Sequence, residues 1–174
     1  ILNEGNFTWG NASVTGVDLN SYKVYQEVYK TVNNLPLGDV AQSMFMRNDT
    51  GWVVVNHSGK IEVVELPSFK RLYTISGLNS PRYMDCAGDT CYVTELYANL
   101  VRVLTTRGEM LHSLPHNGLA DEIKIVSNTV WVSTSRDSTT TVSSLNRYTG
   151  ELVETIVKDA ESVYFEENAL YWVK

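Results

Sequence analysis

Hydrophobic and polar residues alternate along most of the chain, in short runs that turn residues interrupt. The segments at residues 49–59, 89–99, 128–138 and 168–174 each begin with a turn residue and continue into an alternating run with an aromatic residue near its centre. Alternation with a period of two is typical of β-strands that bury one face. Helical spacing of hydrophobic residues is not prominent, and we therefore expect an all-β protein.

The aromatic residues at the centres of these strands recur at a nearly constant interval. They are Trp52, Tyr92, Trp131 and Tyr171, which are 40, 39 and 40 residues apart. Another alternating segment precedes each aromatic strand, and in the complete units two more follow it. Each unit therefore reads as four short antiparallel strands, A to D. Four strands in a repeat of about 40 to 45 residues are characteristic of β-propeller blades.

The predicted fold is thus all-β, a β-propeller of four-stranded antiparallel blades, with about four blades in the chain. We expect residues 1–174 to form one propeller domain or a part of one. The blade units fall at roughly residues 1–38, 39–78, 79–119, 120–160 and 161–174, the last being incomplete. In the first unit, residues 1–5, 12–19 and 24–32 take the places of the B, C and D strands.

The strand count leaves two arrangements open. The chain is either a piece of a ring of roughly six to eight blades, or a compact four-bladed ring that closes by pairing its last two strands with strands of the first unit. A small ring around a narrow axis is the rarer solution, so we expect the first. A β-sandwich is the competing fold, but it gives no reason for the even spacing.

Composition and charge narrow the range of partners. With 43% hydrophobic and 20% charged residues, the chain has the composition of a folded, soluble protein. Its net charge of -6 would repel a phosphate backbone, so nucleic acid is not expected as a partner. No apolar stretch approaches the roughly 20 residues of a membrane span. Ile1 leads directly into strand-like sequence, which indicates a cytosolic protein or a mature or trimmed form.

Residue patterns with a defined chemistry are largely missing from the sequence. We find no phosphate-binding loop, nucleophile elbow or zinc-binding pattern, and we expect neither an enzyme nor a bound cofactor or metal. Asp121 and Glu122 stand out as adjacent acids at the start of an A strand. Cys86 and Cys91 flank a turn-like segment, which leaves two interpretations open: a disulfide across a hairpin, or two small buried thiols.

In a propeller, the D–A and B–C connections gather on one face, around the mouth of the central channel. Here these loops are rich in Asn, Ser, Asp and aromatic residues, which suits recognition of a polar ligand or a protein surface. We select candidate ligand-binding residues that combine hydrogen-bonding groups with aromatic faces. They are Asn6, Trp9, Asp39, Gln42, Asn56, Arg82, Tyr83 and Tyr97.

The same loops resemble a known family. The strings that carry the resemblance are LNEGNF, PLGDVAQSM, VVVNHSGKIEVVE, GLNSPRYM and CYVTELYA, at residues 2–7, 36–44, 53–65, 77–84 and 91–98. They are similar to the YncE-like surface propellers of Bacteroidetes, and most of all to the cobalamin-binding BtuG lipoproteins. The resemblance runs from residue 1 to about residue 104, beyond which only the general blade pattern remains.

The resemblance implies a seven-bladed ring at the cell surface, lipid-anchored to the outer membrane or secreted. It also implies capture of a corrinoid (cobalamin) for delivery to a TonB-dependent outer-membrane transporter, without catalysis. An oxidising compartment would suit a bond between Cys86 and Cys91. Two departures from the family are the lack of a lipid-attachment cysteine at the start and the presence of little more than half of the expected blades.

Two other functions remain as alternatives to ligand capture. The first is a scaffold of the cell envelope that docks a transporter or another protein and has no small-molecule ligand. The second is a propeller enzyme, which we rank last because no acid, base and metal set converges. The amide-edged ring of a corrinoid calls for amide, hydroxyl and aromatic partners, and the candidate residues offer that mixture.

Overall fold

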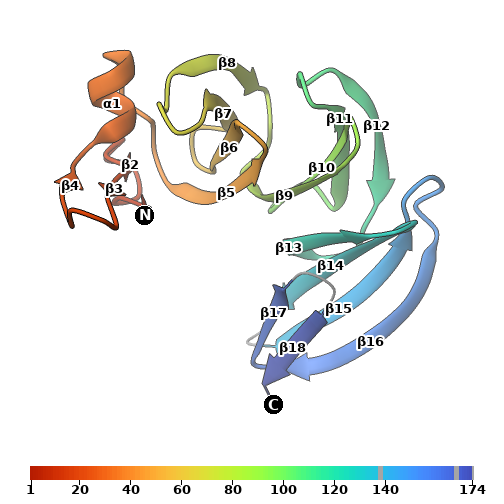
Figure 1. The fold of residues 1–174 in the computed structure, drawn as a ribbon. Coiled ribbons are helices and arrows are strands. Elements are labelled where there is room, and N and C mark those ends of the chain that lie inside the picture. Colours follow the sequence, from red (N-terminus) through yellow and green to blue (C-terminus); the bar gives the residue numbers. More distant parts are fainter. Residues whose placement is uncertain (137–138, 167–168, 174) are drawn as a thin grey trace. The chain divides into compact units, whose positions relative to one another are not determined.

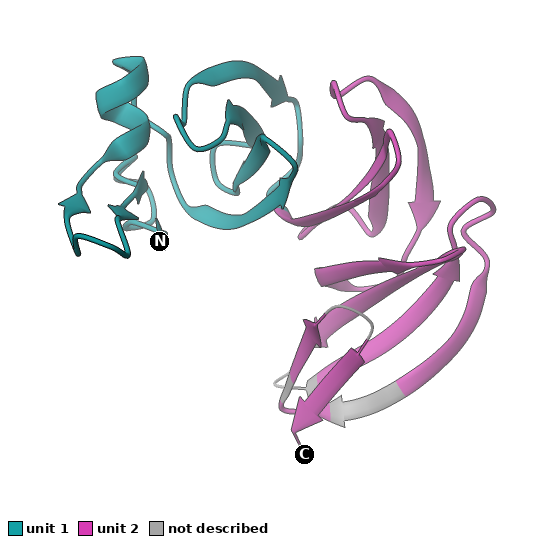
Figure 2. Ribbon diagram, in the orientation of Figure 1, with its two compact units in different colours: residues 1–81 teal, residues 82–174 magenta. Residues whose placement is uncertain are grey.

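The computed structural model describes residues 1–136, 139–166 and 169–173. Strands dominate it, and the chain divides into two compact units, residues 1–81 and 82–174 (Figure 2). Each unit is described by itself below. That the chain forms one propeller domain therefore remains a prediction. No helix among the described residues has the length and apolar character required to cross a membrane.

Three four-stranded antiparallel sheets form the body of the protein, and in each the strands follow one another in chain order (Figure 1). The first consists of β5 (Ala41–Arg47), β6 (Thr50–Val55), β7 (Lys60–Glu65) and β8 (Arg71–Ser76). The second consists of β9 (Pro81–Ala87), β10 (Thr90–Glu95), β11 (Leu100–Thr105) and β12 (Met110–Pro115). The third consists of β13 (Leu119–Val126), β14 (Thr129–Arg136), β15 (Thr139–Asn146) and β16 (Leu152–Ala160). This meander confirms the predicted four-stranded antiparallel blades.

Two-residue turns join the first two strands of each sheet. The first residue of each turn has a positive φ, and these residues are Asn48 (53°), Gly88 (62°) and Ser127 (55°). A left-handed residue at this place gives the turn a twist that matches the twist of the flanking strands. The local sequence thus specifies tight hairpins at a regular interval, and the hairpins set the repeat.

The N-terminal segment carries short strands and the helix. It contains β1 (Leu2–Asn3), β2 (Ser13–Val14), β3 (Gly16–Val17), β4 (Val24–Tyr25) and α1 (Val28–Asn33). β1 pairs with β2, and β3 pairs with β4. The prediction of a D strand over residues 24–32 is wrong beyond Tyr25, because most of that segment is helical.

The spacing of hydrophobic residues explains the helix. Tyr25, Val28, Tyr29 and Val32 follow the i, i+3, i+4, i+7 pattern of a helical face, although the same letters also pass for a strand. Tyr29 is buried in a core cluster that includes Leu37, Val53 and Val64. Packing against the sheet β5–β8 therefore selects the helical period.

At the C-terminal end, β17 (Ser162–Glu166) and β18 (Ala169–Val173) form a two-stranded sheet. Val163, Phe165 and Leu170 pack against the preceding sheet in a cluster with Trp131, Val142 and Ala160. Tyr164 and Tyr171 are cross-strand partners and are both exposed. One face of this hairpin is therefore covered and the other faces solvent in the described structure.

Two of the four repeated aromatic residues, Tyr92 and Trp131, pack between neighbouring sheets as predicted, whereas Tyr171 on the last hairpin is exposed. In unit 2, Tyr92 is 3% exposed and shares a buried cluster with Ile123, Val132 and Leu145 of the following sheet. Trp131 and Val163 of the last hairpin both pack against the buried pair of Val142 and Ala160. Core packing accounts for both rings, because burying a large aromatic side chain is a major stabilising contribution in a sheet interface.

An irregularity recurs at the start of the first strand of two sheets. The pairing shifts between Ala41 and Ser43 in β5, and between Ala120 and Ile123 in β13. Such β-bulges bend the strand and redirect side chains. Gln42 lies in the first bulge, and Asp121 and Glu122 lie in the second.

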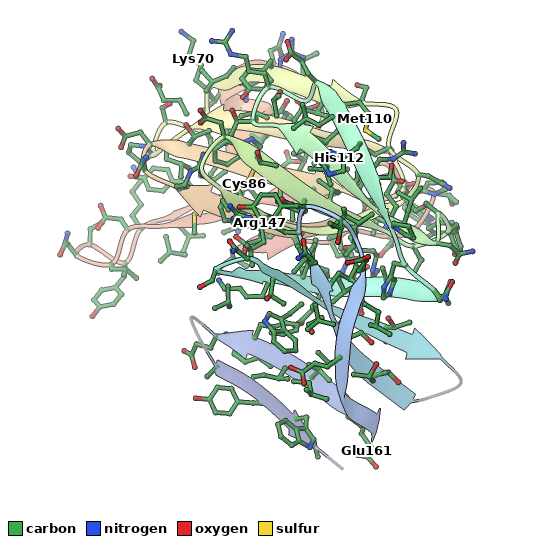
Figure 3. All side chains as sticks on the ribbon, turned by 90° about the vertical axis from the view of Figure 1, so that its right-hand side faces the viewer. Lys70, Cys86, Met110, His112, Arg147 and Glu161 are labelled. Carbon is green, nitrogen blue, oxygen red and sulfur yellow. A yellow bond between two sulfur atoms is a disulfide. The ribbon has the colours of Figure 1, made fainter. Side chains whose placement is uncertain are left out.

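Cys86 and Cys91 form a disulfide between β9 and β10, with 4.1 Å between their Cα atoms. Figure 3 labels Cys86 on its strand. The sequence left two interpretations open, a disulfide or two free buried thiols, and the structure contains the disulfide.

Met110 and His112 lie on the exposed outer strand β12, so His112 belongs to a solvated surface (Figure 3).

Candidate functional site

The loop between β1 and β2 is fixed at several points. The Ala41 N–H donates to the Glu4 carbonyl (3.2 Å), and the Ala12 N–H donates to the Gly38 carbonyl (3.1 Å). Within the loop, the Asn11 side-chain oxygen accepts from the Asn6 N–H at 2.8 Å. These bonds attach the loop to the start of β5 and hold it in one conformation.

Gly5 shows how closely this loop is packed. Its φ is +80°, and a Cβ added there would lie 2.7 Å from the Ala12 nitrogen. Glycine alone combines that backbone angle with that approach. In the sequence, Gly5 ends the segment of residues 1–5 that was predicted to take the place of a B strand, whereas the structure places it in the loop after β1.

Asp39 lies at the base of the loop. Its Oδ2 accepts a hydrogen bond from the Thr8 N–H at 2.8 Å, and its own N–H donates to Ser58 Oγ at 2.9 Å. His57 Nε2 is 3.7 Å from the same Oδ2. The other carboxylate oxygen, Oδ1, is buried and has no hydrogen-bond partner in the described part of the protein. A buried acceptor without a donor is unfavourable and calls for a further group.

Two large aromatic side chains of this fixed loop point to solvent. Phe7 is 64% exposed and Trp9 is 73% exposed. The Phe7 ring lies 4.3 Å from the His57 ring, with an angle of 55° between their planes. The loop therefore presents apolar ring faces to solvent above a carboxylate that is largely buried.

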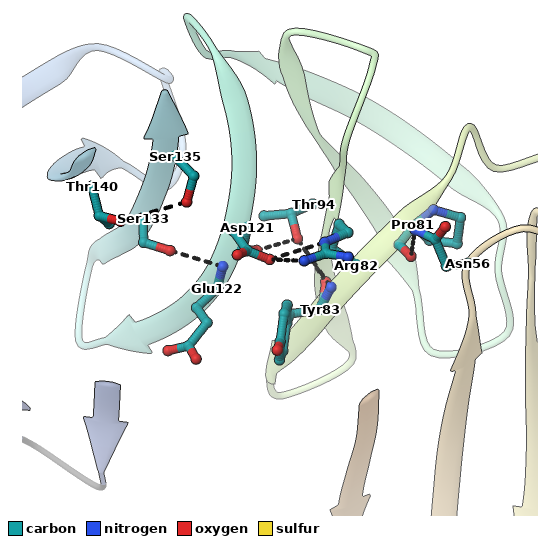
Figure 4. Close-up of polar contacts among 10 residues, drawn as sticks. All are labelled: Asn56, Pro81, Arg82, Tyr83, Thr94, Asp121, Glu122, Ser133, Ser135 and Thr140. Carbon is teal, nitrogen blue, oxygen red and sulfur yellow. Dashed lines mark hydrogen bonds and ion pairs between the residues drawn. The ribbon is translucent and has the colours of Figure 1, made fainter. Parts of the chain in front are cut away.

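Asn56 and Gln42 occupy different environments from Trp9. Asn56 is buried, and its Nδ2 donates to the Pro81 carbonyl at 2.9 Å, while its N–H donates to the Val40 carbonyl at 2.8 Å. Its amide is thus used in holding the backbone (Figure 4). Gln42 is partly buried in the β5 bulge.

In unit 2, the predicted residue Arg82 pairs with Asp121. Its Nε and a terminal nitrogen both contact Asp121 Oδ1, at 2.9 and 2.8 Å (Figure 4). The Tyr83 N–H donates to Thr94 Oγ1 at 3.0 Å, and that hydroxyl donates to the Asp121 carbonyl at 2.6 Å. Tyr97 is 66% exposed in the turn after β10. The structure thus links Arg82 to the adjacent acids that the sequence had singled out.

A cavity of about 180 Å³ lies beside this network. The residues that line it are Asp121, Glu122, Ser133, Ser135, Thr140, Glu161 and Val163. Burial raises the pKa of Glu122, the negative charge of Asp121 raises it further, and a hydrogen bond from the Phe165 N–H opposes both. The sequence singled out Asp121 and Glu122 as adjacent acids, but none of the lining residues was predicted to bind a ligand. The bulge and the cross-strand register, which bring these residues together, are not visible in the sequence.

A larger hollow of about 580 Å³ lies in unit 1. Its lining is mostly apolar and includes Val17, Tyr25, Val32 and Phe69. None of the predicted ligand-binding residues lines it. No group of three or more His, Cys, Asp or Glu side chains within the described ranges is arranged to hold a metal ion.

The predicted ligand-binding residues divide between the units. Unit 1 contains Asn6, Trp9, Asp39, Gln42 and Asn56, and unit 2 contains Arg82, Tyr83 and Tyr97. The structure brings the loop of Asn6 and Trp9 onto Asp39, and it places Arg82 next to Tyr83 on β9. The prediction that all eight residues surround one ligand remains a prediction.

The repeated sheets define the class of the protein, a β-propeller-type fold. Solved structures agree with this assignment. Hydrazine synthase of Kuenenia stuttgartiensis matches with a TM-score of 0.69 at 20% identity, over 87% of this chain and 45% of that one. The dihydro-heme d1 dehydrogenase NirN matches with a TM-score of 0.60 at 13% identity, over 91% and 38%.

The computationally designed Ika4 protein is also similar, with a TM-score of 0.55 at 14% identity over 76% of this chain and 92% of that chain. The chain spans less than half the length of the hydrazine synthase and NirN chains. No protein-family model matches the sequence, and no curated protein is significantly similar to it. At these identities the likeness concerns the fold alone.

Proposed function

We propose that the protein is a cell-surface ligand-binding propeller that captures a corrinoid and passes it to an outer-membrane transporter. The observation that carries the proposal is the fixed loop of residues 3–12, which exposes Phe7 and Trp9 beside Asp39. The resemblance of this loop to the cobalamin-binding lipoproteins supplies the ligand class. A seven-bladed ring, a lipid anchor and a TonB-dependent partner belong to the same proposal.

The chemistry of the loop suits such a ligand. An exposed indole face covers apolar parts of a flat macrocycle, and a fixed loop loses little conformational entropy on binding. Asp39 Oδ1 is buried and has no donor among the described residues, and a side-chain amide of the ligand that displaced the groups covering it would donate to it in a charge-assisted hydrogen bond. Neither contact requires an acid, a base or a metal, so the proposed role is binding without catalysis.

Cyanocobalamin tests the proposal directly. The protein is incubated with it and passed over a sizing column, and its affinity is then measured by equilibrium dialysis. We expect the red colour to elute with the protein, and Trp9→Ala to weaken binding about tenfold or more, because aromatic anchors contribute most of the affinity at such sites.

Tyr22→Ala is the matched control, since Tyr22 is 79% exposed in the same unit but lies outside the loop. It should leave the affinity unchanged. If no colour elutes with the protein, the corrinoid proposal fails and the envelope scaffold becomes the better interpretation. Equal losses in both variants would instead remove the loop from the site.

A further inference from the structure

The cavity beside β13 has walls that both donate and accept hydrogen bonds. Ser133, Ser135 and Thr140 supply hydroxyl groups, and Asp121, Glu122 and Glu161 supply carboxyl groups. Among the described residues of the lining, Val163 is the one apolar residue. A neutral ligand with several hydroxyl groups matches such walls, because each of its hydroxyls can donate to a carboxylate and accept from a side-chain hydroxyl.

The hydroxyl groups lie on one face of two paired strands. Ser133 and Ser135 are two residues apart on β14, so they share a face, and Ser135 is the cross-strand partner of Thr140 on β15. The Ser135 and Thr140 hydroxyl oxygens are 3.5 Å apart (Figure 4). Ser133 Oγ accepts from the Glu122 N–H at 2.9 Å, which leaves its own proton available to donate.

One of these hydroxyl groups, that of Ser133, has a counterpart in a neighbouring sheet. The position of Ser133, two residues after the repeated aromatic, is occupied in the sheet β5–β8 by Val54, which is fully buried. In the sheet β9–β12 it is Thr94, whose hydroxyl is engaged by Tyr83 and Asp121. In the sheet β13–β16 the equivalent hydroxyl accepts from the Glu122 N–H, as Thr94 accepts from the Tyr83 N–H, and it also lines the cavity.

Charge argues against an anionic occupant, and the arrangement of the side chains argues against a metal ion. Carboxylates in the walls disfavour a phosphate or another anion, and Arg82 already pairs with Asp121. For a cation, the described residues supply no group of three ligands in a metal-holding arrangement. The volume of about 180 Å³ is below the roughly 300 Å³ at which sites for drug-sized ligands begin, so the occupant is small or is one end of a larger molecule.

We infer that the cavity between β13, β14, β15 and β17 binds a single sugar ring or a polyol of similar size. Glu122 and Glu161 accept hydrogen bonds from ligand hydroxyls, and Ser135 and Thr140 both donate and accept. Val163 lies against the C–H side of the ring. This site does not share residues with the loop of Trp9, so it goes beyond the proposed corrinoid function and can fail independently of it.

The test is a titration of the isotopically labelled protein, followed by the amide NMR signals of Glu122, Ser133 and Ser135. The probes are D-glucose, D-galactose, D-mannose and myo-inositol, each raised to tens of millimolar. We expect saturable shifts at these amides with at least one probe. The double substitution Ser135→Ala and Thr140→Val should weaken that binding about tenfold, the effect of losing hydrogen bonds to the ligand.

The chain offers a matched control for these substitutions. Ser143 and Thr155 form another hydroxyl pair across β15 and β16, 3.1 Å apart and outside the cavity. The double variant Ser143→Ala and Thr155→Val should bind the sugar as the wild type does, as should Trp9→Ala. The amide spectrum of each variant shows whether it is folded.

Three results would overturn the inference. One is the lack of a saturable shift with any neutral probe. Another is an equal effect of the cavity and control variants. The third is tighter binding of ethylammonium or calcium chloride than of every sugar, which would make the cavity a cation site.

Discussion

At the scale of single residues, His116 illustrates a buried polar group that the fold accommodates. It is 6% exposed, and its Nε2 lies 2.6 Å from Thr134 Oγ1. Burial lowers the pKa of its imidazole. The ring is thus held neutral at physiological pH, and its partner is a hydroxyl, which makes His116 a structural residue.

The lowered pKa has a consequence for stability that can be measured. Because the unfolded chain protonates His116 at higher pH than the folded protein does, the free energy of unfolding decreases as the pH falls through the unfolded-state pKa of about 6.5. We expect His116→Gln to flatten the stability profile between about pH 7.5 and pH 5.5. Urea unfolding at a series of pH values measures this, and parallel profiles for the two proteins would contradict it.

At the scale of strands, the first strand of a sheet depends near its start on a hydroxyl from the neighbouring strand. The Tyr83 N–H donates to Thr94, and the Glu122 N–H donates to Ser133. In β13, Ser133 Oγ accepts from the Glu122 N–H, which lies in the bulge and takes no part in the regular pairing of the strands. The B strand thus satisfies backbone groups that the sheet pairing leaves open.

Thr94→Val tests this role with a side chain of nearly the same shape. Thr94 is fully buried, so the substitution leaves the Tyr83 N–H and the Asp121 carbonyl without their partner. We expect a loss of about 1–3 kcal/mol in the free energy of unfolding, measured by urea denaturation. Thr155→Val is the control, because its hydroxyl pairs only with that of Ser143 among the contacts described, and it should cost less than about 1 kcal/mol. Equal losses would refute the assigned role.

The sequence predicts much at this scale, and what it misses has physical causes. Tight turns and alternation place the strands from Ala41 onward, since both depend on near neighbours in the chain. The helix at Val28–Asn33 is not predicted, because a short run of Val and Tyr fits both the helical and the strand period, and packing decides between the two. The cavity is not predicted from the sequence, because the bulge in β13 and the pairing of Ser135 with Thr140 depend on contacts between strands.

At the scale of the whole molecule, stability in unit 2 comes from sheets that cover one another. Aromatic residues at equivalent positions of the repeat differ in how far they are buried. Tyr92 is 3% exposed beneath the following sheet, whereas Tyr171 is 55% exposed on the last hairpin. The sequence predicts the same packed position for both residues, because the position of a residue in the repeat does not reveal which faces of a sheet are covered.

This difference predicts unequal effects of the same substitution. Tyr92→Ala removes a ring from a packed interface and should lower the free energy of unfolding by about 3–5 kcal/mol. Tyr171→Ala removes a solvated ring and should cost less than about 1 kcal/mol. Chemical denaturation of the two variants measures both values. A large loss at Tyr171 would show that its face is covered in solution.

The bulge in β13 has a wider implication. In a regular strand, neighbours point to opposite sides, so changing what one side recognises risks altering the core on the other. The extra residue at Asp121 and Glu122 relaxes this constraint and frees adjacent positions from the alternation. Substitutions at this place can therefore change the chemistry of the cavity while the packing of the sheet is retained.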